Sequence, residues 1–435
     1  MYKNIFLFIF CLFFSFEIKL FAQILTIDDA LQIALSQNFA AQLVKFDQQI
    51  AQNNYQKGNA GLQPTITGNI DYGGSVINAK QEFLTGSVQN VNNAINRNGN
   101  IGVNMNWLIF NGFAAQRTYQ ILGLQKELTN LNVRLQLENI TANTIITYCN
   151  IVQNKQTAKV LTENLSISQE RVRIAKDRFE LGAMSKNDYL RAQIDAKRDS
   201  ANLIQQLQQI KIAKIQLNQI LNRNVKTEFE VSENLPDTKT ITYNEILENL
   251  KAQNTQLLIQ RKQNDVAFIN TQITKGQILP SVNFTAGYNY ANAVAGAGIL
   301  RTNQNYGLNG RVTITIPIFD GYERQRNIQN AVIAQKRQQT TIEQTQLEAE
   351  TNLTQAFEQY QTSLELLKIE KENVIITKQN LEITVEKFQL GKITALEFRD
   401  AQQTFLEIQN RVLLLNFQLK VQEINLLRIS GSLIK

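Results

Sequence analysis

Four segments of the chain alternate apolar and polar residues with a period of two, the pattern of a β-strand with two different faces. They are 65–72, 101–107, 282–290 and 308–316. Each has about the length that crosses an outer membrane as a tilted strand, although the same alternation also fits half-buried hairpins of a soluble domain. The segments predict two strand hairpins, 65–110 and 281–319. The Gly- and Asn-rich residues between paired strands, 75–99 and 291–305, predict loops.

Around these strands the apolar period changes to that of helices. Residues 113–181 are interrupted only by Gly123, and residues 322–390 contain neither Gly nor Pro. At 1.5 Å per residue, each run predicts a helix of about 100 Å. Shorter helices are expected before the strands and after the long helices, so that two short helices placed end to end match one long helix. Their predicted ranges are 26–58, 185–221, 242–275 and 394–429.

Each long helix ends in the same short motif. A Leu-Gly pair is followed by a Ser or Thr and, three residues later, by an acid. Gly reaches the left-handed conformation that ends a helix, and the hydroxyl with its acid caps the next helix. We therefore expect the tight tips of two helical hairpins. The residues are Leu181, Gly182, Ser185 and Asp188 in the first tip and Leu390, Gly391, Thr394 and Glu397 in the second.

The chain is built from two copies of one pattern. Motifs before the strands recur after 216 residues, as from Pro64 to Pro280, and motifs after the strands recur after 209 residues, as from Gly182 to Gly391. The second copy is therefore shorter by seven residues, the difference between the two offsets. We expect repeats at 23–225 and 242–435, joined by a linker at 226–241 that includes a small strand-bearing patch.

Residues 1–22 have the features of a cleaved signal peptide. A Lys precedes an apolar run that is too short to span a bilayer, and Leu20-Phe21-Ala22 follows as a cleavage site before Gln23. The peptide would remove Cys11 and leave Cys149 as the only Cys, with no role that the sequence assigns. The protein is therefore expected to be exported and to fold without an intramolecular disulfide.

Composition argues against catalysis and against nucleic-acid binding. The chain has no His, which removes the commonest general base and metal ligand. It also lacks a phosphate-binding loop, a nucleophile motif and metal-ligand spacing. The formal net charge of +7 is mild for 435 residues and forms no basic run. We therefore expect no enzyme activity, no cofactor, no metal site and no nucleic-acid partner.

Four strands are too few to close a barrel, for which about eight is the usual minimum. An open sheet edge in lipid would leave backbone groups without partners, at several kcal/mol each. If the strands cross a membrane, several copies of the chain must therefore associate to close the sheet. The polar strand faces would then line a water-filled lumen.

The duplicated order of strands, long helix, Leu-Gly tip and return helix resembles the TolC family of outer-membrane efflux and secretion channels. The resemblance includes Phe110-Asn111-Gly112 and Phe319-Asp320-Gly321 beside the strands. It implies a mainly α fold with a membrane β-barrel. The expected assembly is a homotrimer with a twelve-stranded barrel in outer-membrane lipid, continued by a periplasmic α-helical barrel. It also implies passive conduction within a tripartite efflux or type I secretion system, with a periplasmic adaptor protein and an inner-membrane RND or ABC transporter.

The resemblance also assigns roles to tip residues. An acidic ring at the periplasmic aperture would contain Asp400, Glu397 and Asp188. Helix capping explains Glu397 as well as the acidic ring does, and it explains Asp188 better, whereas Asp400 lies beyond the first helical turn. Contacts with the adaptor would be made by the exposed tips, which include Leu181, Gly182, Ser185, Leu390, Gly391 and Thr394.

The second tip departs from the family pattern. Well-known members carry a tyrosine and an arginine that latch neighbouring helices, and this chain has Phe388 and Ile393 at those places. The closed-state latch is therefore expected to differ. The alternative function is a trimeric coiled-coil structural protein of the cell envelope. The sequence does not identify the transported substrate, whether drug, metal or protein, or the pump and adaptor.

Overall fold

The computed structural model describes residues 24–238 and 240–434. The predicted signal peptide, with Cys11, lies outside the described residues. The described chain forms two compact units, and each includes parts of both sequence copies. The first contains 24–38, 140–241 without 239, and 356–425, and the second contains 39–139, 242–355 and 426–434.

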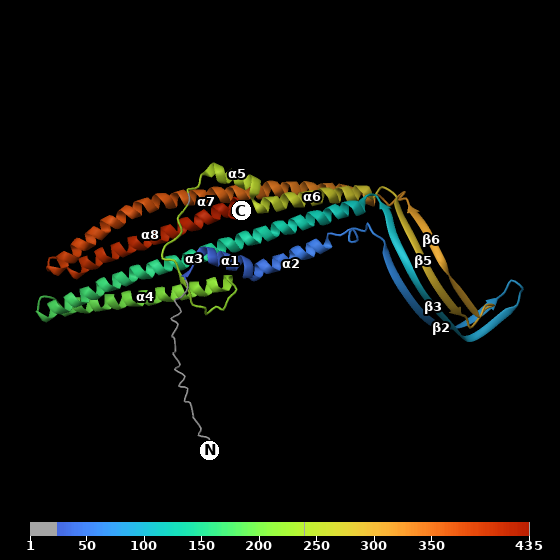
Figure 1. The fold of residues 1–435 in the computed structure, drawn as a ribbon, viewed down its shortest axis with the longest axis horizontal. Coiled ribbons are helices and arrows are strands. Elements are labelled where there is room, and N and C mark those ends of the chain that lie inside the picture. Colours follow the sequence, from blue (N-terminus) through green and yellow to red (C-terminus); the bar gives the residue numbers. More distant parts are fainter. Residues whose placement is uncertain (1–23, 239, 435) are drawn as a thin grey trace, which may run out of the picture. The chain divides into compact units, whose positions relative to one another are not determined.

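The second unit contains one antiparallel sheet of four strands in the order β2-β3-β5-β6 (Figure 1). The strands are β2 (Thr65–Glu82), β3 (Val88–Asn111), β5 (Ser281–Val294) and β6 (Thr302–Thr315). The two predicted hairpins are present and are joined through β3 and β5. Each outer strand, β2 and β6, is paired along one edge only among the described residues.

The predicted loops are wrong over most of their length. Residues 75–82 and 88–99 continue the paired strands β2 and β3, and the turn between them is short. Likewise, β5 continues to Val294 and β6 begins at Thr302. Apolar residues such as Val76 and Ile95 still alternate with Asn and Gly in these segments, and they lie opposite each other. Cross-strand pairing therefore outweighs the loop preference of Asn and Gly.

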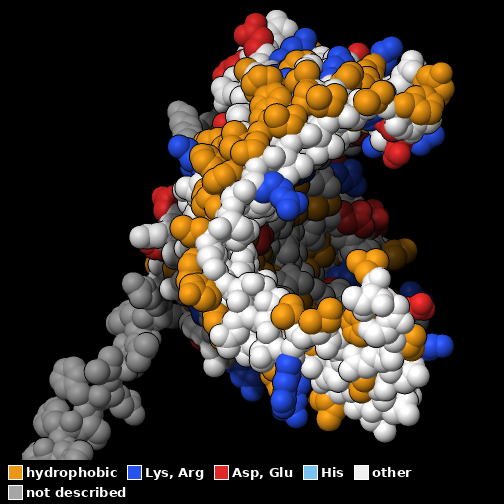
Figure 2. Space-filling view, turned by 90° about the vertical axis from the view of Figure 1, so that its right-hand side faces the viewer, with side chains coloured by type: hydrophobic (Ala, Val, Ile, Leu, Met, Phe, Trp, Pro, Cys, Tyr) orange, Lys and Arg blue, Asp and Glu red, His pale blue; other side chains and the backbone are white. Residues whose placement is uncertain are grey.

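The strand register confirms one apolar and one polar face. Ile66 lies opposite Met105, Val103 lies opposite Tyr288, and Tyr288 also lies opposite Leu308. Because side chains alternate along each strand, the residues between these positions share the other face. In the view of Figure 2, hydrophobic side chains gather in a band beside uncharged polar side chains.

The long helices and the helices that return from the tips match the prediction to within a residue or two. The long helices α3 (Ala114–Glu180) and α7 (Glu323–Gln389) have 67 residues each. The return helices α4 (Lys186–Ile220) and α8 (Ala395–Ile429) have 35 residues each. Within the described residues, none of the helices combines the length and the apolar character needed to cross a membrane.

The helices before the strands are each broken in two, and the prediction of continuous helices is wrong there. The pairs are α1 (Ile27–Gln37) with α2 (Phe39–Asn54), and α5 (Tyr243–Gln253) with α6 (Thr255–Gly276). The breaks fall at Asn38 and Asn254. Each Asn side chain donates to the last carbonyl of a return helix, at Ile220 and Ile429 respectively, and both distances are 2.8 Å. Each break thus satisfies a helix end that lacks an intrahelical donor.

The linker between the copies contributes a small strand patch, as expected. In the first unit, β4 (Glu230–Val231) pairs in parallel with β1 (Ile24–Leu25). Tyr148 of α3 fixes this pair, because its hydroxyl donates to the Leu25 carbonyl and accepts the Ser232 N–H.

Candidate functional site

Both hairpin tips lie in the first unit and close with the same backbone geometry. Gly182 and Gly391 have φ values of 73° and 76°, in the left-handed region. After each Gly, the next N–H reaches back to a helix carbonyl, from Ala183 to Arg178 at 2.8 Å and from Lys392 to Lys387 at 2.9 Å. Each of these backbone hydrogen bonds satisfies a carbonyl that the helix itself leaves without a partner. The predicted tip geometry is confirmed.

The predicted helix caps are also present. The Ser185 hydroxyl accepts the Asp188 N–H at 3.1 Å, and the Thr394 hydroxyl accepts the Glu397 N–H at 3.2 Å. The Glu397 carboxylate accepts the Thr394 N–H at 2.7 Å and completes a capping box. These hydrogen bonds from the backbone and hydroxyl of Thr394 lower the pKa of the Glu397 carboxyl.

The other predicted site residues differ in exposure. Leu181 and Leu390 are 83% and 69% exposed at the tip ends. Glu397 and Asp400 are both exposed and lie three residues apart on α8, so they share a helix face. Among the described residues, the Asp400 side chain has no hydrogen-bond or ion-pair partner. Capping therefore accounts for Glu397, while no side-chain contact among the described residues accounts for Asp400.

A cleft of about 630 Å³ separates the two tips within the first unit. It brings together four of the predicted residues, Ser185, Asp188, Gly391 and Thr394. Leu181, Gly182, Leu390, Glu397 and Asp400 are not among the lining residues. Five Arg also line the cleft, and the sequence analysis assigned them no role there: Arg171, Arg178, Arg191, Arg198 and Arg399.

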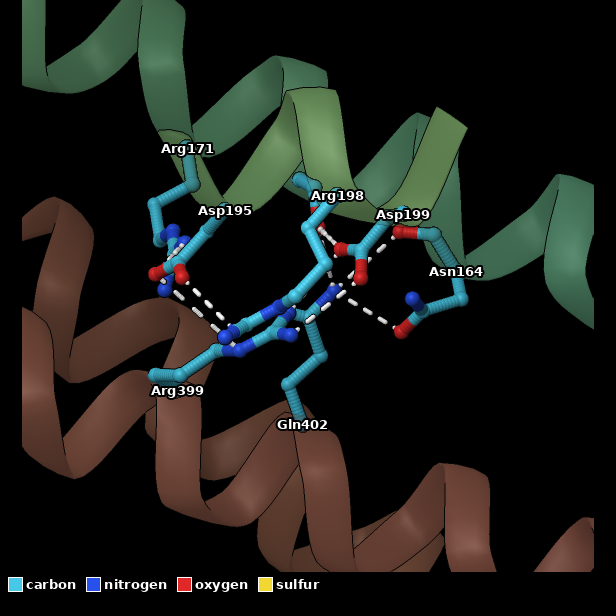
Figure 3. Close-up of polar contacts among 8 residues, drawn as sticks. Asn164, Arg171, Asp195, Arg198, Asp199, Arg399 and Gln402 are labelled. Carbon is cyan, nitrogen blue, oxygen red and sulfur yellow. Dashed lines mark hydrogen bonds and ion pairs between the residues drawn. The ribbon is translucent and has the colours of Figure 1, made fainter. Parts of the chain in front are cut away.

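Buried charges join the two hairpins beside this cleft (Figure 3). Asp199 of α4 and Arg399 of α8 are only 2% and 8% exposed. Two Arg399 guanidinium nitrogens, Nη1 and Nη2, meet the two Asp199 carboxylate oxygens at 2.9 and 3.1 Å. Such bidentate pairs are strong, and removing one partner from a buried pair costs about 3–5 kcal/mol.

Helix α3 supplies the rest of the cluster. Gln402 of α8 donates to the Asn164 side chain at 2.9 Å and to the Ser168 hydroxyl at 2.8 Å. Arg171, which is 1% exposed, pairs with Asp195 of α4 at 2.6 Å. Burial lowers the pKa of the Arg171 guanidinium, and its bond to Asp195 opposes that effect. The cluster thus ties α8 to both α3 and α4.

Phe388, which the sequence analysis placed at the position of the latch tyrosine, belongs to a packed pair of aromatic residues. Phe388 is fully buried, and its ring centre lies 5.0 Å from that of Phe398. The Arg178 guanidinium carbon lies 5.3 Å from the centre of the Phe388 ring, and Arg178 also donates to the Gln389 carbonyl at 2.9 Å. An Arg of the first hairpin therefore contacts the end of the second hairpin.

The sequence reasoning missed this cluster. Its only sequence signal is the spacing of Asp195 and Asp199, which puts two acids on one face of α4. A pair of acids at that spacing is normally solvated. Only the packing of α8 against α4 distinguishes the buried Asp199 from other helix acids.

The polar face of the strands is a row of amides and glycines. Asn104 and Asn309 both lie opposite Gly287, and Asn289 lies opposite Gly102. The Asn289 amide donates to Asn104 at 3.3 Å and to Asn309 at 3.0 Å. A Cβ at Gly287 would lie 2.3 Å from the Asn104 side-chain oxygen, so these glycines make room for the amides. At these positions the surface is polar and carries no charge.

Other candidate chemistry is limited. The described residues contain no group of three or more His, Cys, Asp or Glu arranged to hold a metal ion. Cys149 is buried, and burial raises the pKa of its thiol to about 11. The thiol is therefore protonated at neutral pH and is a poor nucleophile.

Comparison with known proteins decides the family. The sequence profile of the outer membrane efflux protein family matches residues 30–223 and 246–432. The chain belongs to this family. The curated protein "Outer membrane efflux protein BepC" of Brucella suis biovar 1 (strain 1330) is 21% identical over 313 residues, which cover 72% of this chain and 67% of BepC.

Solved structures share the fold at lower identity. The Campylobacter jejuni CmeC outer membrane channel is 16% identical with a TM-score of 0.77, over 94% of this chain and 86% of CmeC. A crystal structure of CusC is 18% identical with a TM-score of 0.77, over 93% of this chain and 92% of CusC. The predicted outer-membrane location and efflux-channel function are confirmed for this family member. The comparisons give no support to a coiled-coil structural protein.

Proposed function

We propose that three copies of this chain form the outer-membrane channel of a tripartite efflux or type I secretion system. The four-stranded sheet carries this proposal, because it has one apolar face, one polar face and two free edges. Three such sheets supply twelve strands, enough to close a barrel. The apolar faces then contact lipid, and the amide-rich polar faces line the lumen. The repeats, 23–225 and 242–435 with a linker at 226–241, each give one strand hairpin and one helical hairpin.

The helical hairpins continue the lumen as a periplasmic helical barrel that narrows at the tips. Asp400 and Glu397 form an acidic ring there, with six carboxylates in a trimer, and Asp188 adds a charge from the first tip. The exposed Asp400 supports this assignment best, because no side-chain contact within the described part of the chain explains it. The buried cluster around Asp199 and Arg399 holds α8 in place and so positions the ring.

The exposed tips contact a periplasmic adaptor protein. Apolar Leu181 and Leu390 project from the tip ends, and the cleft between the tips presents Ser185 and Thr394 beside Gly391. Gly182 belongs to the same surface. An inner-membrane RND or ABC transporter supplies the energy. Conduction through the channel is passive and needs no catalysis or cofactor.

Single-channel conductance in a planar bilayer tests this function. The comparison is wild type against Asp400→Ala combined with Glu397→Ala, with Glu407→Ala as the control for an exposed acid farther along α8. We expect a small, cation-selective conductance for the wild type and the control. The double variant should lose the selectivity, because the carboxylates that attract cations are gone. A conducting double variant with unchanged selectivity would mean that Glu397 acts only as a helix cap and that the acidic ring does not set the selectivity. A folded protein that never inserts into lipid would contradict the channel.

A further inference from the structure

The two repeat offsets hold for individual strand pairs. Adding 216 to a residue of β2 and 209 to its partner in β3 converts the pair Ile66–Met105 into the pair Val282–Ile314, which β5 and β6 do form. The same conversion turns Gly68–Val103 into Phe284–Val312, which is also formed. The register of one hairpin therefore predicts that of the other.

The contact between β3 and β5 joins the second strand of one copy to the first strand of the next copy. Its repeat equivalent is a contact between β6 and the β2 strand of another chain, because β6 corresponds to β3 and β2 corresponds to β5. We propose that β6 pairs antiparallel with β2 of a neighbouring copy in the register that the offsets dictate. The pair Val103–Tyr288 then becomes Val312 opposite Tyr72, and Met105–Ala286 becomes Ile314 opposite Ile70. This inference rests on the proposed oligomeric channel.

The side chains at the two free edges fit this register. Val312 and Tyr72 are 60% and 79% exposed at the edges of the sheet, and pairing places both on the apolar face. Ile314 meets Ile70 in the same way. A slip of one residue would place apolar side chains of one strand on the polar face of the other. The alternation therefore excludes odd shifts, and a further feature must exclude shifts of two.

Two opposite charges exclude a shift of two in one direction. Asp71 on β2 and Arg311 on β6 both lie on the polar face, and both are exposed. Neither side chain has an ion-pair or hydrogen-bond partner among the described residues. In the proposed register Arg311 lies opposite Gly73, which has no side chain, and diagonally beside Asp71. Diagonal neighbours are within reach of a long side chain. The ion pair between Arg311 and Asp71 of the neighbouring copy can form in this register and is lost if β6 shifts so that Arg311 faces Ser75. The opposite shift, which would put Arg311 directly across from Asp71, is excluded by the repeat equivalence with the contact between β3 and β5.

The same charges are missing from the internal contact. The repeat equivalents of Arg311 and Asp71 are Gly102 and Gly287, which lie diagonally across β3 and β5. The charge pair thus belongs only to the boundary between copies. An acid on one outer strand and a base on the other also directs β6 toward β2 instead of toward a second β6.

Disulfide trapping of the full chain in outer membranes tests the register. Asn309 and Ser75 lie opposite each other in the proposed pairing, as Asn100 and Ala291 do within the chain. In a Cys149→Ala background, Asn309→Cys with Ser75→Cys should give a covalent trimer on oxidation. Within one chain these residues lie on opposite edges of the sheet, at least about 14 Å apart across three strand spacings. Ser75 is also eight residues along β2 from Thr67, the residue level with Asn309, so no intramolecular disulfide can form.

The matched control shifts the pair by two residues on the same face. Asn309→Cys with Gly73→Cys, and each single variant, should give no covalent trimer. Trapping of the shifted pair, or of neither pair in a protein that is trimeric by native mass spectrometry, would overturn the register and leave the proposed channel standing. A chain that stays monomeric in mild detergent would overturn the proposed channel itself.

Charge reversal tests the ion pair independently. Asp71→Arg and Arg311→Asp should each lower the temperature at which the trimer dissociates in detergent, on the order of 2–4 °C. The double variant exchanges the charges and should restore the wild-type temperature. A double variant whose loss equals the sum of the two single losses would refute the contact.

Discussion

The two helical hairpins share their turns and differ in the surfaces that they bury. Both tips end a helix at a left-handed Gly and start the next with a hydroxyl cap. Arg399 on α8 is buried against Asp199, whereas its repeat equivalent on α4, Leu190, is 43% exposed. Asp199 in turn corresponds to Ile408 of α8. The duplication preserved the local signals that shape a turn, and it let the facing side chains diverge.

This difference shows how one chain orders its own hairpins. With identical surfaces, either hairpin could pack against the other in two equivalent ways. The charges on α4 and α8 permit one arrangement, because a buried acid requires its base. The first two predictions below substitute a residue of one hairpin and its repeat equivalent in the other.

The largest effect is expected at the buried ion pair. Arg399→Ala leaves the Asp199 carboxylate buried without its partner and should lower the free energy of unfolding by about 3–5 kcal/mol. Leu190→Ala, at the equivalent and partly exposed position, should cost about 1 kcal/mol or less. Urea unfolding followed by far-UV circular dichroism in detergent measures both. Equal losses would mean that the two hairpins are not distinguished by this pair.

The second-largest difference in stability loss is expected between the aromatic residues that precede the two tips. Phe388 is fully buried, so Phe388→Ala should cost about 3 kcal/mol through lost burial and a residual cavity. Its equivalent Phe179 is 37% exposed and stacks on Tyr189, and Phe179→Ala should cost about 1 kcal/mol. The same unfolding measurement applies. A larger loss at Phe179 would place the packed core of the tips in the first hairpin.

The smallest effect is a pH dependence at the second tip. Hydrogen bonds from Thr394 lower the pKa of Glu397 in the folded protein. The stability that they add is therefore present above the pKa of the unfolded chain, about 4.3, and is lost as the pH falls through the lower folded value. Glu397→Gln should flatten the decline in melting temperature between pH 5 and pH 3, and Glu407→Gln should not. An unchanged decline in melting temperature for Glu397→Gln would show that the Glu397 carboxylate does not stabilise the protein through capping.

Features encoded by neighbouring residues were predictable from the sequence. The strand faces follow from alternation, and the tips follow from Leu-Gly and the hydroxyl caps, so both agree with the structure. The strand ends were missed, because the high Asn and Gly content of residues 75–99 indicated a loop although their alternation continued.

Features that depend on distant partners were not predictable. The breaks at Asn38 and Asn254 exist because each Asn reaches the end of a helix far away in the chain. The burial of Asp199 depends on Arg399, 200 residues later. The residues around these Asn and Asp side chains do not reveal such distant contacts, since an Asn within a helix and an acid on a helix surface are both common.

The central claim is that the helical tips set the opening of an outer-membrane channel. Single-channel conductance of Asp199→Arg, Arg399→Asp and the combined exchange tests it most directly. Each single reversal places two like charges together and should loosen α8, so conductance should rise above that of the wild type. The exchange restores the pair and should return conductance toward the wild-type value. Wild-type conductance in all three inserted variants would contradict the claim.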